Sequence, residues 1–330
     1  MPIPYVLTAY GLPHVMGYLQ TQSGVAHPAP LGVLGLMDAA QEMNLAGIEI
    51  PLGKPGTPPV SEIADAAKER GLRVVPDWLT ITGGTAADFE MFLADAQVLG
   101  ATVVRATLSH VLCGDRRGVA DGWPAYLETV AARLRELLPI AEQHGMAIAL
   151  ENHQDATSDD LLRLYEQTGN SPAFGVCLDA GNPLAVGEGC VEFARRVAPL
   201  IRHVHLKDYT MHFAPNGYRL VRCAAGTGVV DFSAILEIVR ANGHDVLPGI
   251  EIAAQPTRTI PLLEDGWWAC HTPEQSRYLP EALRTLWAQG KLQAEPYSSA
   301  WERGEDSEAI SSEEWAVVRE SVAYFRSLGD

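Results

Sequence analysis

Four side chains that can bind a metal ion stand at matching places in the sequence, each at the end of a short apolar run. They are Glu151, Asp179, His205 and Glu251, and the intervals between them are 28, 26 and 46 residues. Each interval has room for a helix and a return strand. Two glutamates, one aspartate and one histidine make an oxygen-rich set with a single nitrogen. This set suits Mn²⁺, Mg²⁺ or Co²⁺ better than a structural Zn²⁺, which would recruit thiolates.

Short apolar runs alternate with helical patterns along the chain. We expect strands at 5–11, 46–53, 72–79, 101–108, 146–153, 173–182, 202–209 and 248–254, and helices at 31–45, 61–71, 86–100, 124–145, 158–169, 190–201 and 231–243. This alternation predicts a parallel sheet covered on both sides, and eight units fit a (β/α)8 TIM barrel. An open doubly wound sheet is the alternative, but no G-x-G-x-x-G motif follows the first strand. In a barrel the carboxyl ends of the strands share one mouth, so the four side chains would meet there.

The part of the chain after the last strand is unusually long for a connection. We expect an extended loop region over 253–312, in which Trp267 offers a ring face to a sugar or an aromatic aglycone. The alternative is a loop that packs against a neighbouring subunit. Residues 313–328 have helical spacing and predict a closing helix of the same barrel, so we interpret residues 1–330 as a single domain.

Composition narrows the classes of partner. Lys and Arg total 24 against 41 Asp and Glu, and the net charge of −17 argues against a nucleic-acid partner. No apolar stretch approaches 18 residues, so no membrane span is expected. The first residues do not resemble a secretory leader. Five scattered cysteines with no C-x-x-C motif favour reduced thiols, and we predict a cytoplasmic protein.

Other polar residues near the strand ends are weaker candidates. His153 lies two residues after Glu151 and is a candidate catalytic base, although a hydrogen-bonded loop histidine is equally open. Lys207 lies two residues after His205 and could stabilise an oxyanion or form a salt bridge at the rim. Glu49 ends the second strand and could orient a metal ligand. Expected substrate-binding residues are Tyr10, His14, Arg105, Asn182, Arg222, Arg258 and Trp267.

The motifs "ALENH", "CLDAGN", "HVHLKD" and "GIEIA", in this order, resemble the sugar-phosphate isomerase/epimerase family with the xylose-isomerase-like barrel. That family includes ketose 3-epimerases, inosose dehydratases, hydroxypyruvate isomerases and a metal-dependent endonuclease. The resemblance implies that Glu151, Asp179, His205 and Glu251 bind one divalent metal. Mn²⁺ is the expected ion, with Mg²⁺, Co²⁺ and Zn²⁺ as alternatives. In the epimerases the two glutamates also act as acid and base on opposite faces of the substrate.

The sequence departs from the ketose 3-epimerases at three positions. Those enzymes carry a glutamate, a histidine and an arginine where this chain has Thr157, Asn182 and Met211. The three side chains with which those enzymes bind a free ketohexose are therefore absent. The endonuclease fits less well, because it needs additional histidine ligands and favours a basic surface.

These observations predict a metal-dependent sugar isomerase or epimerase that acts on a keto-sugar or its derivative. A metal ion that bridges a carbonyl and its neighbouring hydroxyl acidifies the C–H bond and stabilises an enediolate. A lyase of the same family is the main alternative, either an inosose-type dehydratase or a 3-oxo-glycoside deglycosidase with a small second chain. A non-catalytic, metal-containing sugar-binding protein is the third. The expected partners are a small-molecule sugar and either a second copy of the chain or a small subunit.

Overall fold

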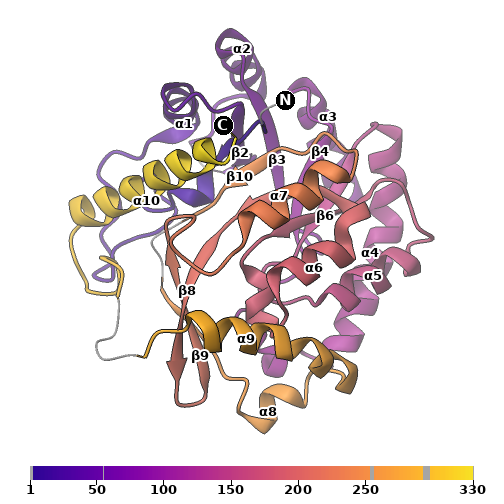
Figure 1. The fold of residues 1–330 in the computed structure, drawn as a ribbon. Helices are drawn as coiled ribbons and strands as arrows, with labels where there is room; N and C mark the ends of the chain where they lie inside the picture. Colours follow the sequence, from indigo (N-terminus) through magenta and orange to yellow (C-terminus); the bar gives the residue numbers. More distant parts are fainter. Residues whose placement is uncertain (1–2, 55, 253–255, 293–297, 330) are drawn as a thin grey trace.

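The structure is a computed structural model that describes residues 3–54, 56–252, 256–292 and 298–329. Eight parallel strands close a barrel in the order β1-β10-β7-β6-β5-β4-β3-β2, which confirms the predicted TIM barrel (Figure 1). Its strands are β1 (Val6–Thr8), β2 (Gly47–Pro51), β3 (Arg73–Thr80), β4 (Val103–Thr107), β5 (Ala147–Glu151), β6 (Phe174–Asp179), β7 (Ile201–Leu206) and β10 (Pro248–Ile250). We call the carboxyl-terminal end of these strands the barrel mouth.

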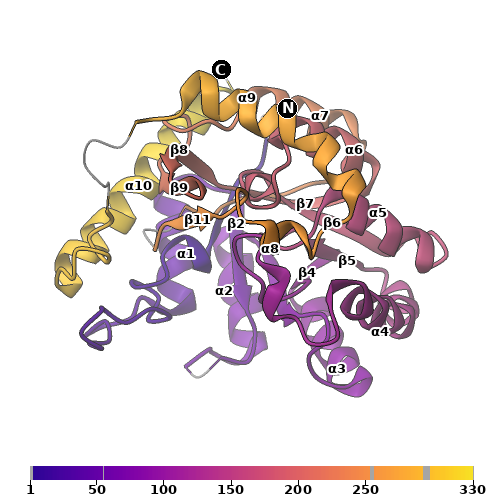
Figure 2. The ribbon, with the colours of Figure 1, turned by 90° about the horizontal axis from the view of Figure 1, so that it is seen from below.

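Helices surround the barrel in a ring (Figure 2). They are α1 (Gly32–Glu42), α2 (Val60–Arg70), α3 (Ala86–Val98), α4 (Trp123–Gln143), α5 (Ser158–Gln167), α6 (Cys190–Val197) and α7 (Phe232–Ala241). Short 3₁₀ turns lie at Ala9–Gly11, Arg116–Gly118, Asn182–Val186, Ala198–Leu200 and Pro273–Tyr278. Local sequence fixes several helix ends. The hydroxyl of Thr157, for example, caps α5 by accepting the backbone N–H of Asp160, whose carboxylate accepts the Thr157 N–H in return.

A three-stranded antiparallel sheet stands at the barrel mouth and is absent from our sequence prediction. It consists of β8 (Asp208–Ala214), β9 (Gly217–Cys223) and β11 (Arg258–Ile260) (Figure 2). The predicted strand over 202–209 is therefore wrong at its end, because the barrel strand stops at Leu206 and the chain turns into β8. We call these three strands the mouth sheet.

The expected extended loop over 253–312 is also wrong in part. Besides β11, the region holds α8 (Asp265–Trp268), the turn Pro273–Tyr278 and α9 (Leu279–Gln289). Residues 253–255 and 293–297 lie outside the described residues. The closing helix α10 (Ser307–Ser327) starts earlier than the predicted 313, because the Asp306 carboxylate accepts the backbone N–H of Ala309 and caps it there.

The barrel interior is apolar at the end away from the mouth. A small cluster fills this end, and its members are Val6, Val75, Val103, Ala149, Cys177 and Leu247. Alternate side chains of barrel strands stack in such layers. The polar groups of the mouth therefore lie on an apolar layer that excludes water, and this strengthens the electrostatic interactions among them.

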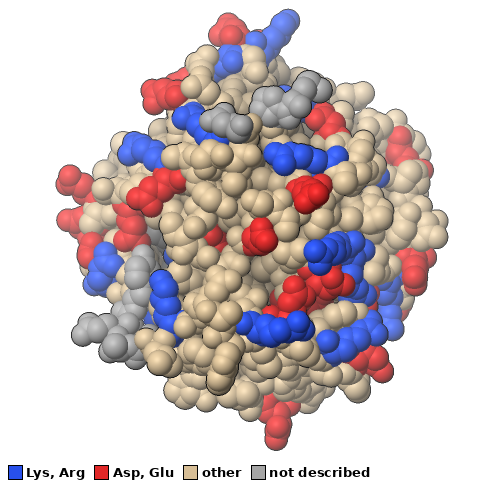
Figure 3. Space-filling model, in the orientation of Figure 1, with Lys and Arg blue, Asp and Glu red and all other residues tan. Residues whose placement is uncertain are grey.

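The surface carries no single dominant charge on the face in view, since basic and acidic side chains are interspersed there (Figure 3). Within the described residues, no helix combines the length and the apolar character that crossing a membrane requires. All five cysteines are free thiols.

Helix α10 is fastened to the barrel by a buried carboxylate. Glu314 accepts the backbone N–H groups of His14 and Val15 at 2.9–3.1 Å. Burial raises the pKa of Glu314 to about 8, although the two N–H groups oppose the shift. The folded state therefore favours the protonated acid. The associated stability is full below the usual pKa of 4.5 and is lost as the pH rises through about 8.

We predict that Glu314→Ala lowers the free energy of unfolding by roughly 2–4 kcal/mol at pH 6, because two buried N–H donors lose their acceptor. The decline in stability between pH 5 and pH 8 should also become shallower in this variant. Urea unfolding at several pH values measures both effects. Glu320→Ala, at an exposed position of the same helix, is the control. Equal stability of both variants would contradict this role of Glu314.

Candidate metal centre

The four predicted ligands meet at the barrel mouth. Glu151 ends β5, Asp179 ends β6, His205 lies near the end of β7, and Glu251 directly follows β10. One ligand atom from each lies within 4.8 Å of all the others, and all four side chains are buried. The register explains this meeting, because Asp179 and His205 are direct partners in neighbouring parallel strands.

The imidazole of His205 faces carboxylates with both nitrogens. Its Nδ1 lies 2.6 Å from Glu251 Oε2 and 3.3 Å from Glu151 Oε1. Its Nε2 lies 2.9 Å from Glu49 Oε1 and 3.0 Å from Oε2. A metal-binding histidine usually donates its other N–H to a carboxylate, which fixes the ring and raises its basicity. Glu49 stands where that carboxylate is needed, with Nδ1 left to face the ligand cluster.

Two buried cations sit among the carboxylates. Lys207 Nζ lies 2.6 Å from Asp179 Oδ2 and 3.3 Å from Glu251 Oε1. The Arg105 guanidinium lies 2.8 Å from Glu151 Oε2. Burial acts to raise the pKa of Glu151, but Arg105 and His205 outweigh it and lower that pKa to about 2. Burial raises the pKa of Asp179, and the Lys207 ammonium opposes this shift.

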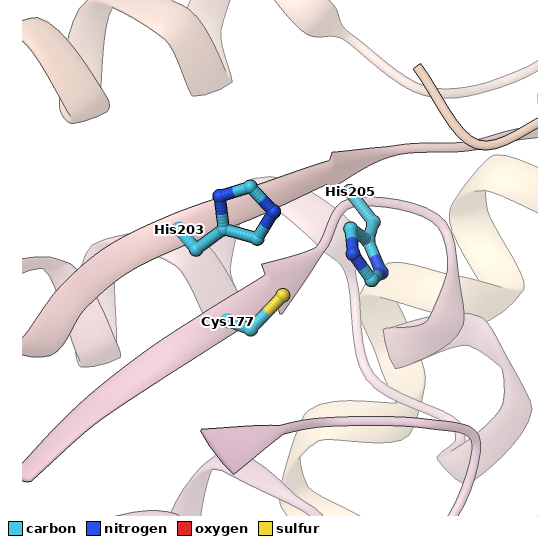
Figure 4. A group of neighbouring side chains, drawn as sticks. All are labelled: Cys177, His203 and His205. Carbon is cyan, nitrogen blue, oxygen red and sulfur yellow. The ribbon is translucent and has the colours of Figure 1, made fainter. Parts of the chain in front are cut away.

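The donor set fits a hard divalent cation. Three carboxylates and one imidazole are the ligands that Mn²⁺ and related ions accept, and the cluster has a surplus of negative charge that a cation would offset. A second group of side chains, Cys177, His203 and His205, also comes together (Figure 4). It shares His205 with the first group. Burial raises the pKa of its thiol to about 12, whereas a metal ligand must be a thiolate. The oxygen-rich group is therefore the better candidate.

Two further predicted residues lie near this cluster. His153 is half-buried, and its Nδ1 is shielded from solvent without a hydrogen-bond partner in the described part of the chain. Burial lowers its pKa to about 4, so the imidazole is neutral at pH 7. Asn182 is buried, and its Oδ1 accepts the hydroxyl of Tyr209 at 2.9 Å.

Cationic and aromatic groups from other elements complete the mouth. Arg222 and Arg258 lie on the mouth sheet and are half-buried. Tyr10 stacks near Arg105, whose guanidinium lies 5.4 Å from the centre of the tyrosine ring. Burial and the nearby Asp77 raise the pKa of Tyr10. All of these side chains remain predicted substrate contacts.

Two of the predicted substrate contacts are used inside the fold. His14 is buried, with its Nδ1 2.7 Å from the Leu19 carbonyl and its Nε2 2.7 Å from the Ser307 hydroxyl. It ties the loop after β1 to α10. Trp267 is fully buried, stacks on His271 with ring centres 4.0 Å apart and donates its Nε1–H to the Cys113 carbonyl. Its expected role as an open sugar platform is corrected to that of a core residue.

Sequence reasoning missed Asp77 on β3. Its side chain is 1% exposed, and neither carboxylate oxygen has a hydrogen-bond partner among the described residues. Burial and the charge of Glu49 raise its pKa well above the usual value. The signal was present, because Asp77 lies near the end of the third predicted strand as the other acids do in theirs.

The three departures from the epimerase pattern have structural roles. Thr157 caps α5 and also accepts a hydrogen bond from Gln275 at 2.9 Å. Met211 is fully buried in the core. Asn182 is held by Tyr209, as described above. Neither Thr157 nor Met211 offers the polar contact that the epimerases use at that position.

The profile of the xylose isomerase-like TIM barrel family matches residues 37–284. The chain belongs to this family. Its curated relatives include enzymes. A 3-oxo-isoapionate decarboxylase of Pectobacterium atrosepticum is 30% identical over 145 residues, which cover 41% of this chain and 51% of that protein. A 3-dehydroshikimate dehydratase of Bacillus anthracis is 26% identical over 191 residues, covering 52% and 66%.

An inosose dehydratase of Clostridium botulinum shares 25% identity over 251 residues, with coverage of 68% of this chain and 84% of that enzyme. The first three curated relatives are matched over only 51% to 66% of their own lengths. This chain therefore matches only part of the length of these three relatives.

Solved structures share the barrel at low identity. A xylose isomerase-like TIM barrel protein from Mycobacterium smegmatis in complex with magnesium has a TM-score of 0.57 and 18% identity, with coverage of 86% of this chain and 98% of that one. An L-ribulose 3-epimerase has a TM-score of 0.54 and 17% identity, with coverage of 98% and 96%. An IOLI protein with a zinc atom has a TM-score of 0.55 and 13% identity, with coverage of 87% and 99%. These likenesses concern the fold.

We predict that Glu49→Gln weakens Mn²⁺ binding by roughly 10- to 100-fold, because an amide orients and polarises His205 less well than a carboxylate. Isothermal titration of the metal-stripped protein measures the affinity. Glu62→Gln, at an exposed position on α2, is the matched control. If both variants bound Mn²⁺ as tightly as the parent, Glu49 would have no role at the centre.

Proposed function

We propose that this protein is a divalent-metal-dependent enzyme that removes a proton next to the carbonyl of a polyhydroxylated ketone. The observation that carries the proposal is the meeting of Glu151, Asp179, His205 and Glu251 within 4.8 Å at the barrel mouth. In this fold the mouth is where active sites lie. Mn²⁺ is the ion we propose first, and the cytoplasm remains the proposed compartment.

A divalent cation held by these four side chains would polarise a substrate carbonyl and acidify the neighbouring C–H bond. The chain's own groups account for the rest. Glu49 holds the His205 ring in place, and Arg105 holds Glu151. Lys207 is a fully buried ammonium beside Asp179 and Glu251, so it is placed to donate a hydrogen bond to a substrate oxygen.

His153 is the proposed base. It lies two residues after Glu151, its Nδ1 makes no hydrogen bond to another described residue, and its imidazole can accept a proton. After it takes the proton, the C–O bond of a hydroxyl on the next carbon breaks, and the imidazolium returns the proton to that hydroxyl, which leaves as water in an elimination. Three relatives carry names of lyases, two dehydratases and one decarboxylase. We therefore place the dehydratase-type lyase first, ahead of the isomerase that the sequence alone favoured.

Isomerisation or epimerisation is the second candidate. It is favoured by the presence of Glu151 and Glu251 in one cluster, since two carboxylates can exchange a proton on opposite faces of a substrate. The ion pair between Arg105 and Glu151 counts against it, because the Arg105 guanidinium lies 2.8 Å from Glu151 Oε2 and holds the carboxylate that would carry the proton. The replaced contacts at Thr157 and Met211 count against a free ketohexose as substrate.

We expect His153→Gln to lower turnover by about 10²-fold or more, since the amide cannot accept the proton. Metal content should stay close to that of the parent, because His153 is outside the ligand cluster. Turnover is assayed on whichever compound the parent converts in a panel of inosose, 3-dehydroshikimate, 3-oxo-glycosides and L-ribulose. His244→Gln, at an exposed position, is the control. Parental turnover in His153→Gln would remove this residue from the mechanism.

The type of reaction is decided by mass. Incubation of the same panel in D₂O with the Mn²⁺-loaded protein should give deuterium in recovered substrate and a product lighter by one water, with ultraviolet absorption from an unsaturated ketone. A product of unchanged mass would replace the lyase by the isomerase. Binding of panel compounds with neither deuterium uptake nor product would leave a non-catalytic sugar-binding protein and contradict the proposed function.

A further inference from the structure

We propose that Arg222 and Arg258 bind a carboxylate of the substrate, so that the ligand of the mouth is a sugar acid or a keto acid and not a neutral sugar. The inference rests on the proposed function in one respect only, namely that the ligand lies at the candidate metal centre.

The register of the mouth sheet puts the two arginines on one face. Arg222 of β9 lies opposite Tyr209 of β8, and Arg258 of β11 lies opposite Leu220 of β9. Directly opposed residues and residues two apart on a strand share a face of a sheet. Arg222 and Arg258 are therefore diagonal neighbours on the face that carries Tyr209.

This face is turned toward the candidate metal centre. The Tyr209 hydroxyl donates to Asn182 Oδ1 at 2.9 Å, and the Tyr209 ring packs so closely over Gly181 that an added Cβ there would lie 2.8 Å from it. Gly181 and Asn182 lie two and three residues after Asp179, which ends the ligand strand β6. Burial acts to lower the pKa of Arg222, and Tyr209, Glu251 and Asp179 outweigh it and raise that pKa.

Arg258 has a charge that the described residues leave without a partner. None of their carboxylates lies within 4.0 Å of its guanidinium, and its buried Nε has no hydrogen-bond acceptor among them. Burial and the adjacent Arg222 lower its pKa. Holding two cations side by side in a partly dry mouth costs free energy, which an anion between them would offset.

Arg219 of the same strand shows the contrast. It lies opposite Thr259 and His212, on the other face of the sheet. Its guanidinium is 3.5 Å from Glu302, and its Nε donates to the Thr257 hydroxyl at 2.7 Å. The protein neutralises this arginine itself, whereas the described residues give Arg258 on the inner face no such carboxylate.

A carboxylate fits this position better than a phosphate. The planar fork of arginine matches a carboxylate with two parallel hydrogen bonds. A phosphate monoester would bring nearly two negative charges close to Asp179 and Glu251, which already crowd the mouth with negative charge. A single charge satisfies the arginines with less repulsion.

The test compares three ligands with similar hydroxyl groups: gluconate, glucitol and glucitol 6-phosphate. Isothermal titration on the Mn²⁺-loaded protein should show gluconate binding roughly tenfold more tightly than glucitol, and more tightly than the phosphate. In Arg258→Gln and in Arg222→Gln the advantage of gluconate should fall to about twofold or less. In the control Arg219→Gln it should persist. Circular dichroism checks that each variant is folded. If Arg258→Gln is not folded, Arg258→Lys replaces it, and the advantage of gluconate should then be lost only in part.

Equal affinity for gluconate and glucitol would overturn the inference. So would an advantage that survives in both inner-face variants, because the carboxylate would then sit on the metal. Tighter binding of glucitol 6-phosphate would overturn the assignment to a carboxylate. The proposed function fails separately, through the absence of deuterium uptake, so anion preference without proton exchange would support the inference and remove only the activity.

Discussion

The burial of negative charge at the barrel mouth is the constraint on which the site depends. Of the described residues, five carboxylates are almost fully buried there: Glu49, Asp77, Glu151, Asp179 and Glu251. Among the described residues, the equally buried cations beside these carboxylates are Arg105 and Lys207. Each uncompensated ion would cost several kcal/mol in such a place. The remaining negative charge must be met by protons, by imidazolium or by a bound cation, and the converging oxygens favour the cation.

The fold supplies both the place and the supporting groups. Parallel strands bring acids that lie far apart in the sequence to one end of the barrel, and an apolar layer beneath them keeps water out of the interior. The mouth sheet begins directly after β7 and carries Arg222 and Arg258 on the face that also holds Tyr209. In the proposed account, a substrate would therefore contact a metal ion at the four ligands and place its carboxylate on the two arginines.

The barrel and its ligand cluster could be predicted because strand ends in a (β/α)8 fold have a fixed destination. A polar residue that closes an apolar run is a local signal, and the topology converts four such signals into one site. The sequence prediction does not include the mouth sheet, because it reads residues 202–209 as one barrel strand, whereas β8 begins at Asp208 and its two-residue turn to β9 lies at Pro215-Asn216. Trp267 could not be assigned from sequence, since its partner His271 is a contact of the folded loop.

The most direct test of this account is the metal content of the protein purified without chelator. Elemental analysis should find about one equivalent of divalent metal per chain, because the four ligands form a single site. The Asp179→Ala variant should lose most of it, and Asp95→Ala, at an exposed position on α3, should keep it. A metal-free protein with full activity, or an Asp179→Ala variant with unchanged metal content, would contradict the account.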